Sequence, residues 1–455
     1  MQIRANKVAL NSKTGGAAAK PSSAPVYEIA RTLPSDTWQE TEVIHDRDAI
    51  FVQRDFHARS KQHDPCVVKA FGTDTPHSGD ALLHYAGPPK GGSTKTPVLL
   101  VHGANKNGNF FWDPSEDGAN KGLAQKLRDE GHDVYAITFA HNQDDNFVWA
   151  EQIANAIAEI KKDTGQEKVD LVAHSKGGVA ARIYTSNVRK EGVESTPYQE
   201  DVRRLVLVGA PNKGVDYTFR HPSANYALLK NSDEHFLNAP VSWEKIGPFP
   251  FFRDVSAQGF SAEEPDYFPG QRQLLADLSD EHPLSMVEPD WYTTYHGGTG
   301  FNSTSQGIQY YVEQGENVIA RLNENPPDSD IEVAVLAGNR ANIPGILNEY
   351  TGPSDGLVFV DSALEMPEGT NLVAQDVLPL HHKALISDEK GQDWIAKAVD
   401  NDKPHSKVDL KGVLKFASKD WKPEKVQPKA LAQVETLTHL TEKPGTASNF
   451  ILPMV

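Results

Sequence analysis

The sequence predicts an α/β protein with a mostly parallel central sheet and helices on both of its faces. Continuous apolar runs, typical of strands buried on both sides, recur between residues 97 and 210 and return after residue 330. Segments with the i, i+3, i+4 spacing of an amphipathic helix separate them. Because strands that alternate with helices form βαβ units, these strands are expected to run parallel.

The expected elements can be placed in order along the chain. Short β-like pieces lie at 49–52 and 82–85. Continuous strands are expected at 97–101, 133–139, 169–173 and 205–208, and further strands at 331–337 and near 372. Helices are expected at 119–130, across 150–160 and at 178–184. The helix across 150–160 is indicated by an apolar stripe of Ala150, Ile153, Ala154, Ile157 and Ile160.

Composition narrows the class of protein. The 455 residues include 45 Lys and Arg against 62 Asp and Glu, a net charge of −17. This balance disfavours nucleic acid as a partner, because phosphate binding needs a cationic face. The single cysteine, Cys66, excludes an intrachain disulfide and a cysteine zinc cluster. No apolar run approaches the roughly 18 residues of a membrane span.

Shifts in composition divide the chain. Residues 1–40 are expected to form a flexible N-terminal extension and residues 41–400 a single domain. Within it, residues 217–311 hold 17 aromatic residues, nearly half of those in the chain, and are expected to form a cap insertion. Residues 401–455 hold nine Lys, no Arg and six acidic residues. This Lys-rich C-terminal extension could contact a lipid surface, although a solvated tail is the plainer interpretation.

The N-terminus carries early positive charges but no apolar stretch of signal-peptide length. A cytoplasmic location is therefore expected. The alternatives are a leader that has been removed and export by a route without an N-terminal signal peptide.

The stretch Ala173-His174-Ser175-Lys176-Gly177-Gly178 fits the pattern of a nucleophile elbow, with Ala in place of the first Gly. A serine on a tight turn from strand to helix adopts a strained backbone, and small neighbours let strand and helix approach. Here the motif follows an apolar strand and opens a helix, which is the context it requires. The alternative is an ordinary strand–turn–helix junction.

A serine hydroxyl needs a base and a carboxylate to become a nucleophile, and in this arrangement they follow in the order acid, then histidine. Asp355 lies in a Pro/Ser/Gly turn after the strand expected at 331–337, where Asx capping is the alternative role. The pair His381-His382 follows, and only one of two adjacent histidines is expected to face Ser175. The loop after the strand at 97–101 is expected to supply the Ala104 N–H to an oxyanion hole, paired with the Lys176 N–H. In that loop His102 is expected to be a structural hydrogen bonder.

These segments resemble a known family. Residues 97–103, 169–178 and 205–214 resemble bacterial class 2 lipases and esterases of the α/β-hydrolase fold. The Ala-His-Ser start is also similar to that of a secreted polyhydroxybutyrate depolymerase type. Residues 319–323, 354–358 and 382–385 are similar to lipase segments around the acid and the base. The resemblance implies an α/β-hydrolase fold with Ser175 as nucleophile, Asp355 as acid and His382 as base.

The expected activity is hydrolysis of carboxylic esters with an apolar acyl group, through an acyl-enzyme, on a lipid or other ester substrate. Alternatives with the same triad are a polyester depolymerase and a phospholipase-type effector; a non-catalytic binding protein of this fold is a third. No cofactor and no metal are expected, and the acidic stretch 113–117 is expected to be a solvated loop rather than a Ca²⁺ site. The oligomeric state stays open. The aromatic residues expected to line the acyl pocket are Phe249, Phe251, Phe252, Trp291, Tyr292 and Tyr295.

Overall fold

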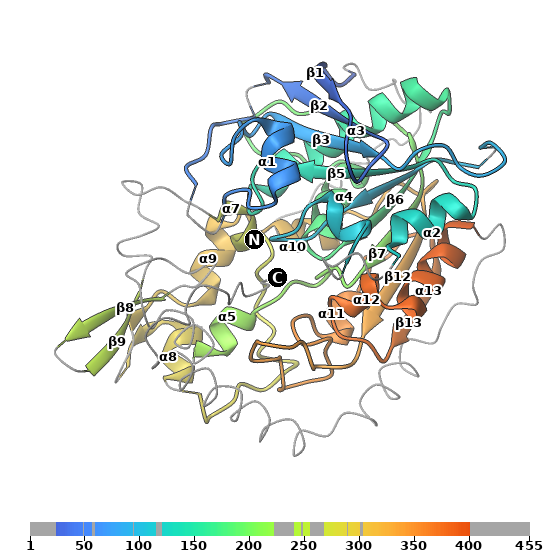
Figure 1. Cartoon of the computed structure of the whole chain (residues 1–455). Helices are drawn as coiled ribbons and strands as arrows, with labels where there is room; N and C mark the ends of the chain where they lie inside the picture. Colours follow the sequence, from blue (N-terminus) through green and yellow to red (C-terminus); the bar gives the residue numbers. More distant parts are fainter. Residues whose placement is uncertain are drawn as a thin grey trace, which may run out of the picture.

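The centre of the protein is a nine-stranded sheet in the order β1-β2-β3-β5-β4-β6-β7-β12-β13 (Figure 1). The computed structural model describes residues 24–48, 50–56, 60–93, 95–114, 121–222, 268–288, 290–300 and 304–400, and the backbone of 241–246 and 249–254. The strands are β1 Tyr27–Leu33, β2 Glu40–Asp46, β3 Asp80–Tyr85, β4 Val98–Val101, β5 Val134–Phe139, β6 Val169–His174, β7 Val202–Val208, β12 Glu332–Gly338 and β13 Leu372–Leu378.

The sheet changes from antiparallel to parallel along its width. β1, β2, β3 and β5 pair antiparallel, and every pair from β5 through β4, β6, β7 and β12 to β13 is parallel. In the sheet β4 and β5 exchange the order that they have in the chain, so that β4 lies beside β6. The carboxyl ends of β4, β6 and β7 therefore lie next to one another. Ligand sites of open α/β sheets form at such ends.

Helices cover both faces of the sheet. On one face α3 (Asn146–Thr164), α4 (Lys176–Thr185), α10 (Val318–Glu324) and α11 (Val360–Leu364) pack on a core that includes Leu99 and Val101 of β4. On the other, η1 (Gly108–Phe111), α2 (Leu123–Asp129), α12 (Ala384–Ser387) and α13 (Glu389–Asp400) pack on a core that includes Val98 and Leu100. Because successive side chains of β4 enter opposite cores, all four are fully buried, as the continuous apolar run predicts. The α/β fold expected from the sequence is confirmed.

The insertion between β7 and β12 forms a separate group of short elements at one side of the molecule (Figure 1). These are α5 (Tyr217–Arg220), β8 (Val241–Ile246), β9 (Phe249–Asp254), α7 (Pro269–Arg272), α8 (Trp291–His296), β10 (Gly298–Thr299), β11 (Thr304–Ser305) and α9 (Ile308–Gln314). It has a small core of its own, formed by Phe219, Leu275, Tyr295, Ile308 and Tyr311.

The first strands differ from expectation. The predicted boundary at residue 41 falls inside β2, and β1 lies within the supposed flexible extension. Four of the seven β1 residues are exposed, so it lacks the apolar run that marked the inner strands. The β-like piece at 49–52 is not a strand at its described residues 50–52. Helix α1 (Pro65–Phe71), which was not foreseen, is capped by the Asp64 carboxylate.

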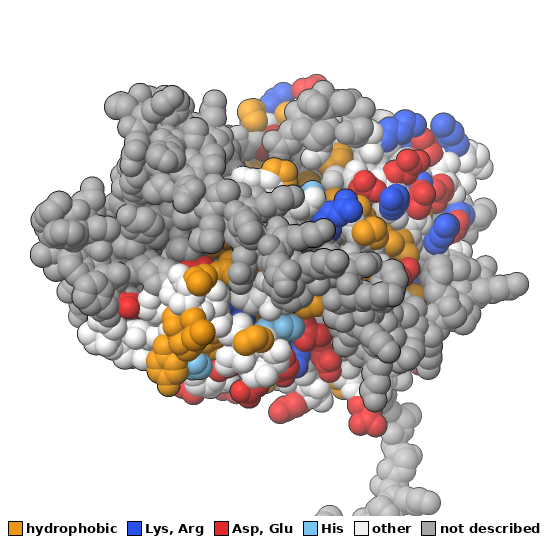
Figure 2. All heavy atoms as spheres, turned by 90° about the horizontal axis from the view of Figure 1, so that it is seen from below, with side chains coloured by type: hydrophobic (Ala, Val, Ile, Leu, Met, Phe, Trp, Pro, Cys, Tyr) orange, Lys and Arg blue, Asp and Glu red, His pale blue; other side chains and the backbone are white. Residues whose placement is uncertain are grey.

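The surface is charged in patches of both signs. On the face in Figure 2, basic and acidic side chains are interspersed at one side, and acidic ones gather along the lower rim. Among the helices of the described residues, none is both long and apolar enough to cross a bilayer. The Lys-rich extension 401–455 lies outside the described residues.

Candidate active site

Ser175 occupies a strained turn between β6 and α4. Its backbone lies at φ 54° and ψ −129°, a region that a non-glycine residue rarely adopts. The turn requires small neighbours: a Cβ on Gly177 would lie 2.4 Å from the carbonyl oxygen of His102. The strain presents the hydroxyl at the carboxyl end of β6, beside the first backbone amide of α4.

Three side chains from distant segments meet at this hydroxyl. His382 Nε2 lies 2.9 Å from Ser175 Oγ, and His382 Nδ1 lies 2.7 Å from Asp355 Oδ2. An ionised carboxylate only accepts, so the Nδ1–H donates to Asp355 and the free Nε2 accepts from the serine hydroxyl. All three residues are at most 3% exposed. This is the geometry of a nucleophile whose proton is removed by an oriented base.

The turn that carries Asp355 holds its carboxylate firmly. Asp355 Oδ1 accepts from the backbone N–H groups of Leu357 at 3.1 Å and Val358 at 2.9 Å, which leaves Oδ2 for His382. The backbone N–H of His382 also donates to the carbonyl oxygen of Asp355 at 2.9 Å. Asp355 and His382 are therefore joined through both side chain and backbone.

His381 does not take part in this arrangement. It is half-buried, and its Nδ1 accepts from the Ala384 N–H at 3.3 Å. Burial lowers the pKa of its imidazole. The structure therefore brings His382, and not His381, to Ser175, in agreement with the expectation that only one of the pair can face the nucleophile.

Two supporting residues were missed by the sequence analysis. His174 lies under His382 and donates from Nε2 to its carbonyl oxygen at 3.2 Å. Gly209, at φ 56°, leaves room for the acid and base, since a Cβ there would lie 3.3 Å from His382 Nδ1 and 3.4 Å from Asp355 Oδ2. The proximity of His174 to Ser175 in the motif was the available signal for the first. Gly209 directly follows the strand next to the elbow, which was the signal for the second.

Two backbone amides in the segments next to Ser175 have no acceptor among the residues that the structure describes. The Lys176 N–H is the first of α4, where no intrahelical acceptor exists. The Ala104 N–H makes no hydrogen bond with any residue that the structure describes. The adjacent His102 donates from Nδ1 to the Gly103 carbonyl oxygen at 2.7 Å and accepts at Nε2 from the Phe139 N–H at 3.3 Å. Burial lowers the pKa of His102 to about 3, which makes it the neutral structural residue expected from the sequence.

The side chain of Lys176 is enclosed in the protein. Its Nζ lies 3.1 Å from the centroid of the Trp149 ring and has no hydrogen-bond partner among the described residues. Burial holds the pKa of this amine well below its ordinary value, although Asp144 and Asp145 oppose the shift. The residue that follows Ser175 therefore carries a buried amine.

The part of the insertion that reaches this region is polar. The Gly270 N–H donates to the Gln143 carbonyl oxygen at 3.1 Å, and the Asn146 side chain donates to the Gly270 carbonyl oxygen at 2.9 Å. A Cβ on Gly270 would lie 2.5 Å from Lys176 Cε. Helix α7 thus packs directly against the residue that follows the nucleophile.

The aromatic residues expected at the acyl pocket have other placements. Phe249, Phe251 and Phe252 lie on β9, whose side chains are outside the described residues. Trp291 is half-buried and Tyr292 is 59% exposed at the start of α8. The buried Tyr295 donates to Asp216 Oδ2 at 2.6 Å and packs in the core of the insertion. This gives Tyr295 a structural role, because its hydroxyl and ring are already used there.

Two groups of carboxylates in the described residues have ligand atoms within 4.8 Å of one another: Glu42, Glu159 and Asp163; and Asp46, Asp48 and Glu151. Neither group includes Ser175, Asp355 or His382. Residues 115–117 of the acidic stretch at 113–117 lie outside the described residues.

The fold and this site define a serine hydrolase of the α/β-hydrolase fold. A model of the class 2 lipase family matches residues 95–229, which contain Ser175 and Ala104. The resemblance to class 2 lipases is thereby confirmed, and the protein is an enzyme that hydrolyses carboxylic esters.

Curated relatives agree with this class. The chain is 26% identical over 293 residues to a triacylglycerol lipase of Pseudarthrobacter phenanthrenivorans, a match that covers 60% of this chain and 84% of the relative. It is also 26% identical over 293 residues to a triacylglycerol lipase of Burkholderia plantarii, covering 60% and 75% of the two chains. Among solved structures, the mature Bacillus licheniformis lipase BlEst2 matches 70% of this chain and 98% of its own, with 16% identity and a TM-score of 0.39.

Proposed function

We propose that the protein hydrolyses esters with an apolar acyl group, with Ser175 as nucleophile, His382 as general base and then general acid, and Asp355 as the orienting carboxylate. The observation that carries this proposal is the unbroken chain of contacts from Ser175 Oγ through both ring nitrogens of His382 to Asp355 Oδ2. His382 takes the serine proton as the hydroxyl attacks the ester carbonyl, and Asp355 stabilises the imidazolium that forms.

The developing oxyanion is bound by the Ala104 and Lys176 amides, which have no other described acceptor and lie on the two loops next to the nucleophile. His382 then returns the proton to the leaving alcohol, which departs and leaves an acyl-enzyme. A water molecule, deprotonated by His382, attacks the acyl-enzyme and releases the acid.

An apolar acyl group is supported by the named activity of the two relatives, which are triacylglycerol lipases. The substrate class proposed here is therefore a neutral lipid ester or a similar apolar ester.

The test compares Ser175→Ala with wild type on p-nitrophenyl esters of increasing chain length. Ser175→Ala is expected to lose essentially all turnover and all labelling by a fluorophosphonate while keeping its fold. Ser186→Ala, at the other end of α4, is the matched control and should keep both. Wild-type turnover in folded Ser175→Ala would overturn the proposal.

The same enzyme preparation should be assayed on emulsified triacylglycerol, on polyester film and on phospholipid vesicles. The proposal predicts the greatest rate on triacylglycerol. A greater rate on film or on vesicles would replace the neutral lipid ester with a polyester or a phospholipid.

A further inference from the structure

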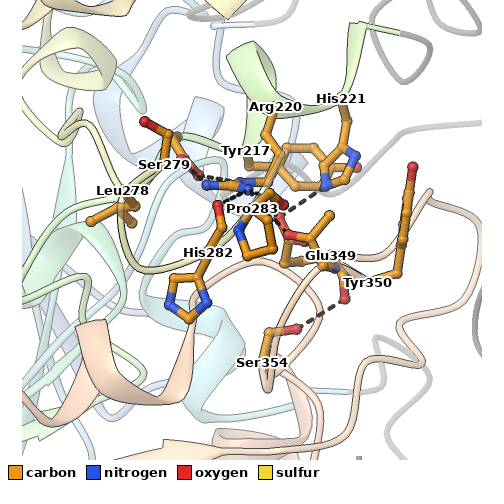
Figure 3. A network of polar contacts seen from close by, with 12 residues as sticks. Tyr217, Arg220, His221, Leu278, Ser279, His282, Pro283, Glu349, Tyr350 and Ser354 are labelled. Carbon is orange, nitrogen blue, oxygen red and sulfur yellow. Dashed lines mark hydrogen bonds and ion pairs between the residues drawn. The ribbon is translucent and has the colours of Figure 1, made fainter. Parts of the chain in front are cut away.

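A buried network of charged side chains ties the insertion to the turn that carries Asp355. Its members are Asp216, Arg220 and His221 at α5, Glu288 further along the insertion, and Glu349 just before the turn. All five are at most 5% exposed. Figure 3 shows Arg220 and His221 from one segment directed toward Glu349 from the other. Such charges stay buried only when each is paired.

Both ring nitrogens of His221 face carboxylates. Nε2 lies 2.9 Å from Glu349 Oε2, and Nδ1 lies 3.2 Å from Glu288 Oε1. Since each carboxylate accepts, both nitrogens donate and the ring is a cation. Burial alone would lower the pKa of His221, but Glu349 and Glu288 outweigh it and raise the pKa to about 9.

Arg220 supplies the second cation. It donates from Nε at 3.0 Å and from an Nη at 2.6 Å to the two oxygens of Asp216, and its Nε lies 3.9 Å from Glu349 Oε2. Its other Nη donates to the carbonyl oxygen of His282 at 2.7 Å. The guanidinium is therefore held through all three of its nitrogens by Asp216 and the His282 carbonyl oxygen, and it lies within ion-pair distance of Glu349.

The backbone of Glu349 brackets the catalytic turn. Its N–H donates to the carbonyl oxygen of Gly356 at 2.8 Å, and its carbonyl oxygen accepts from Ser354 Oγ at 3.0 Å (Figure 3). Ser354 and Gly356 are the immediate neighbours of Asp355. The side chain of Glu349 is in turn held by Thr351, whose N–H and hydroxyl donate at 2.7 Å each.

We propose that Glu349 is a positioning residue for the catalytic acid: its carboxylate, held by Arg220 and His221, fixes the turn that presents Asp355 to His382. The proposal rests on the proposed function, which assigns Asp355 as the acid. Glu349 touches neither Ser175 nor His382, so it acts through the turn. A displacement of a catalytic group by about 1 Å can lower the rate by about 10²-fold.

The test uses Glu349→Ala, assayed on p-nitrophenyl acetate across a range of pH. We expect kcat to fall by about 10- to 100-fold, with a smaller change in KM. The low-pH limb of kcat/KM and the downfield proton resonance of the His382 Nδ1–H should both shift, because the contact with Asp355 is altered. A merely structural loss would move neither.

The matched control is Asp201→Asn. Asp201 is also a buried carboxylate, and it accepts from the Tyr184 hydroxyl at 2.8 Å. It lies at the start of β7, whereas the candidate active site lies at the carboxyl end of the sheet. It should lower the unfolding temperature without changing kcat or the resonance. If Glu349→Ala does not fold, Ser354→Ala is the variant that tests the proposal. It removes the hydrogen bond to the Glu349 carbonyl oxygen and leaves every charge in place. We expect kcat to fall several-fold, with the same shifts of the low-pH limb and of the proton resonance.

Wild-type kcat, pH limb and resonance in whichever of these two variants folds would overturn the positioning role. That result leaves the proposed function intact as long as wild type is labelled at Ser175 by a fluorophosphonate. Activity that survives Ser175→Ala would instead overturn the proposed function, whatever the Glu349 variants do.

Discussion

The rings of His174 and His382 are in contact, with their centroids 4.7 Å apart, and the Nε2 of His174 donates to the backbone carbonyl oxygen of His382. Burial, and then the neighbouring His382, hold the pKa of His174 well below its ordinary value, so this ring remains neutral. A neutral donor fixes the loop of the base without adding a competing charge. The residue before Ser175 thus holds the residue that we propose as its base.

This arrangement predicts different effects on activity for substitutions of the two adjacent histidines, His381 and His382. His382→Ala should leave almost no ester turnover, because no other base lies within hydrogen-bond distance of the Ser175 hydroxyl among the described residues. His381→Ala should keep most of it, since among the described residues the imidazole of His381 bonds only to the Ala384 N–H. Turnover of p-nitrophenyl butyrate checks both, and the opposite ranking would contradict the assignment of the base.

Asp355→Asn should lower kcat by about 10⁴-fold, as in triads that lose the correct tautomer of the histidine. Asp361→Asn and Asp376→Asn are controls, because Asp361 bonds to His282 and Asp376 to the Val377 N–H. Steady-state kinetics of the three variants test this. A mild effect of Asp355→Asn together with a severe effect of one control would assign the role of the acid to the carboxylate changed in that control.

Lys176→Met should stabilise the protein. A buried amine without a hydrogen-bond partner is unfavourable by about 1–3 kcal/mol, and Met fills a similar space. The backbone N–H stays in place, so turnover of short esters should change little. The pKa of Lys176 is lowered in the folded state, so below its ordinary pKa of 10.5 the unfolded chain binds a proton that the folded chain does not. Urea denaturation should therefore show a gain that shrinks as the pH rises toward that value, and a loss of stability at pH 7 would contradict it.

The buried network of charged side chains should make the free energy of unfolding depend on pH at both high and low pH. The pKa of His221 is raised from 6.5 to about 9, so its contribution is complete below pH 6.5 and is lost as the pH rises through 9. Burial would raise the pKa of Glu349, but His221 and Arg220 lower it from 4.5 to about 2, so its contribution is lost as the pH falls from 4.5 through 2.

His221→Asn should accordingly destabilise the protein most between pH 4.5 and pH 6.5. The difference in free energy of unfolding from wild type should shrink by about 3 kcal/mol between pH 6 and pH 10. Denaturation in urea at these two values measures it. An equal difference at both would show that His221 is not held as a cation.

The inner parallel strands could be predicted because they carry apolar runs, whereas β13 has only a short one at its start. The order of Ser175, Asp355 and His382 could be read along the chain. The edge strand β1 could not, since four of its seven residues are exposed and it carries no apolar run. The role of Tyr295 could not be predicted either: an aromatic residue in a cap is equally suited to a pocket or to a small core, and its partner Asp216 lies 79 residues away. A separation of 128 residues likewise conceals the pairing of His221 with Glu349.

The strand order has a consequence for biosynthesis. Ser175 follows the central strand β6, but Asp355 follows β12, and His382 follows β13, which is the edge strand on that side of the sheet. Because His382 comes 207 residues after Ser175, the elbow can emerge from the ribosome long before its base exists. With the roles proposed above, a nascent chain with a folded elbow is therefore inert toward esters, and hydrolysis begins only when β12, β13 and the segments that follow them have been added.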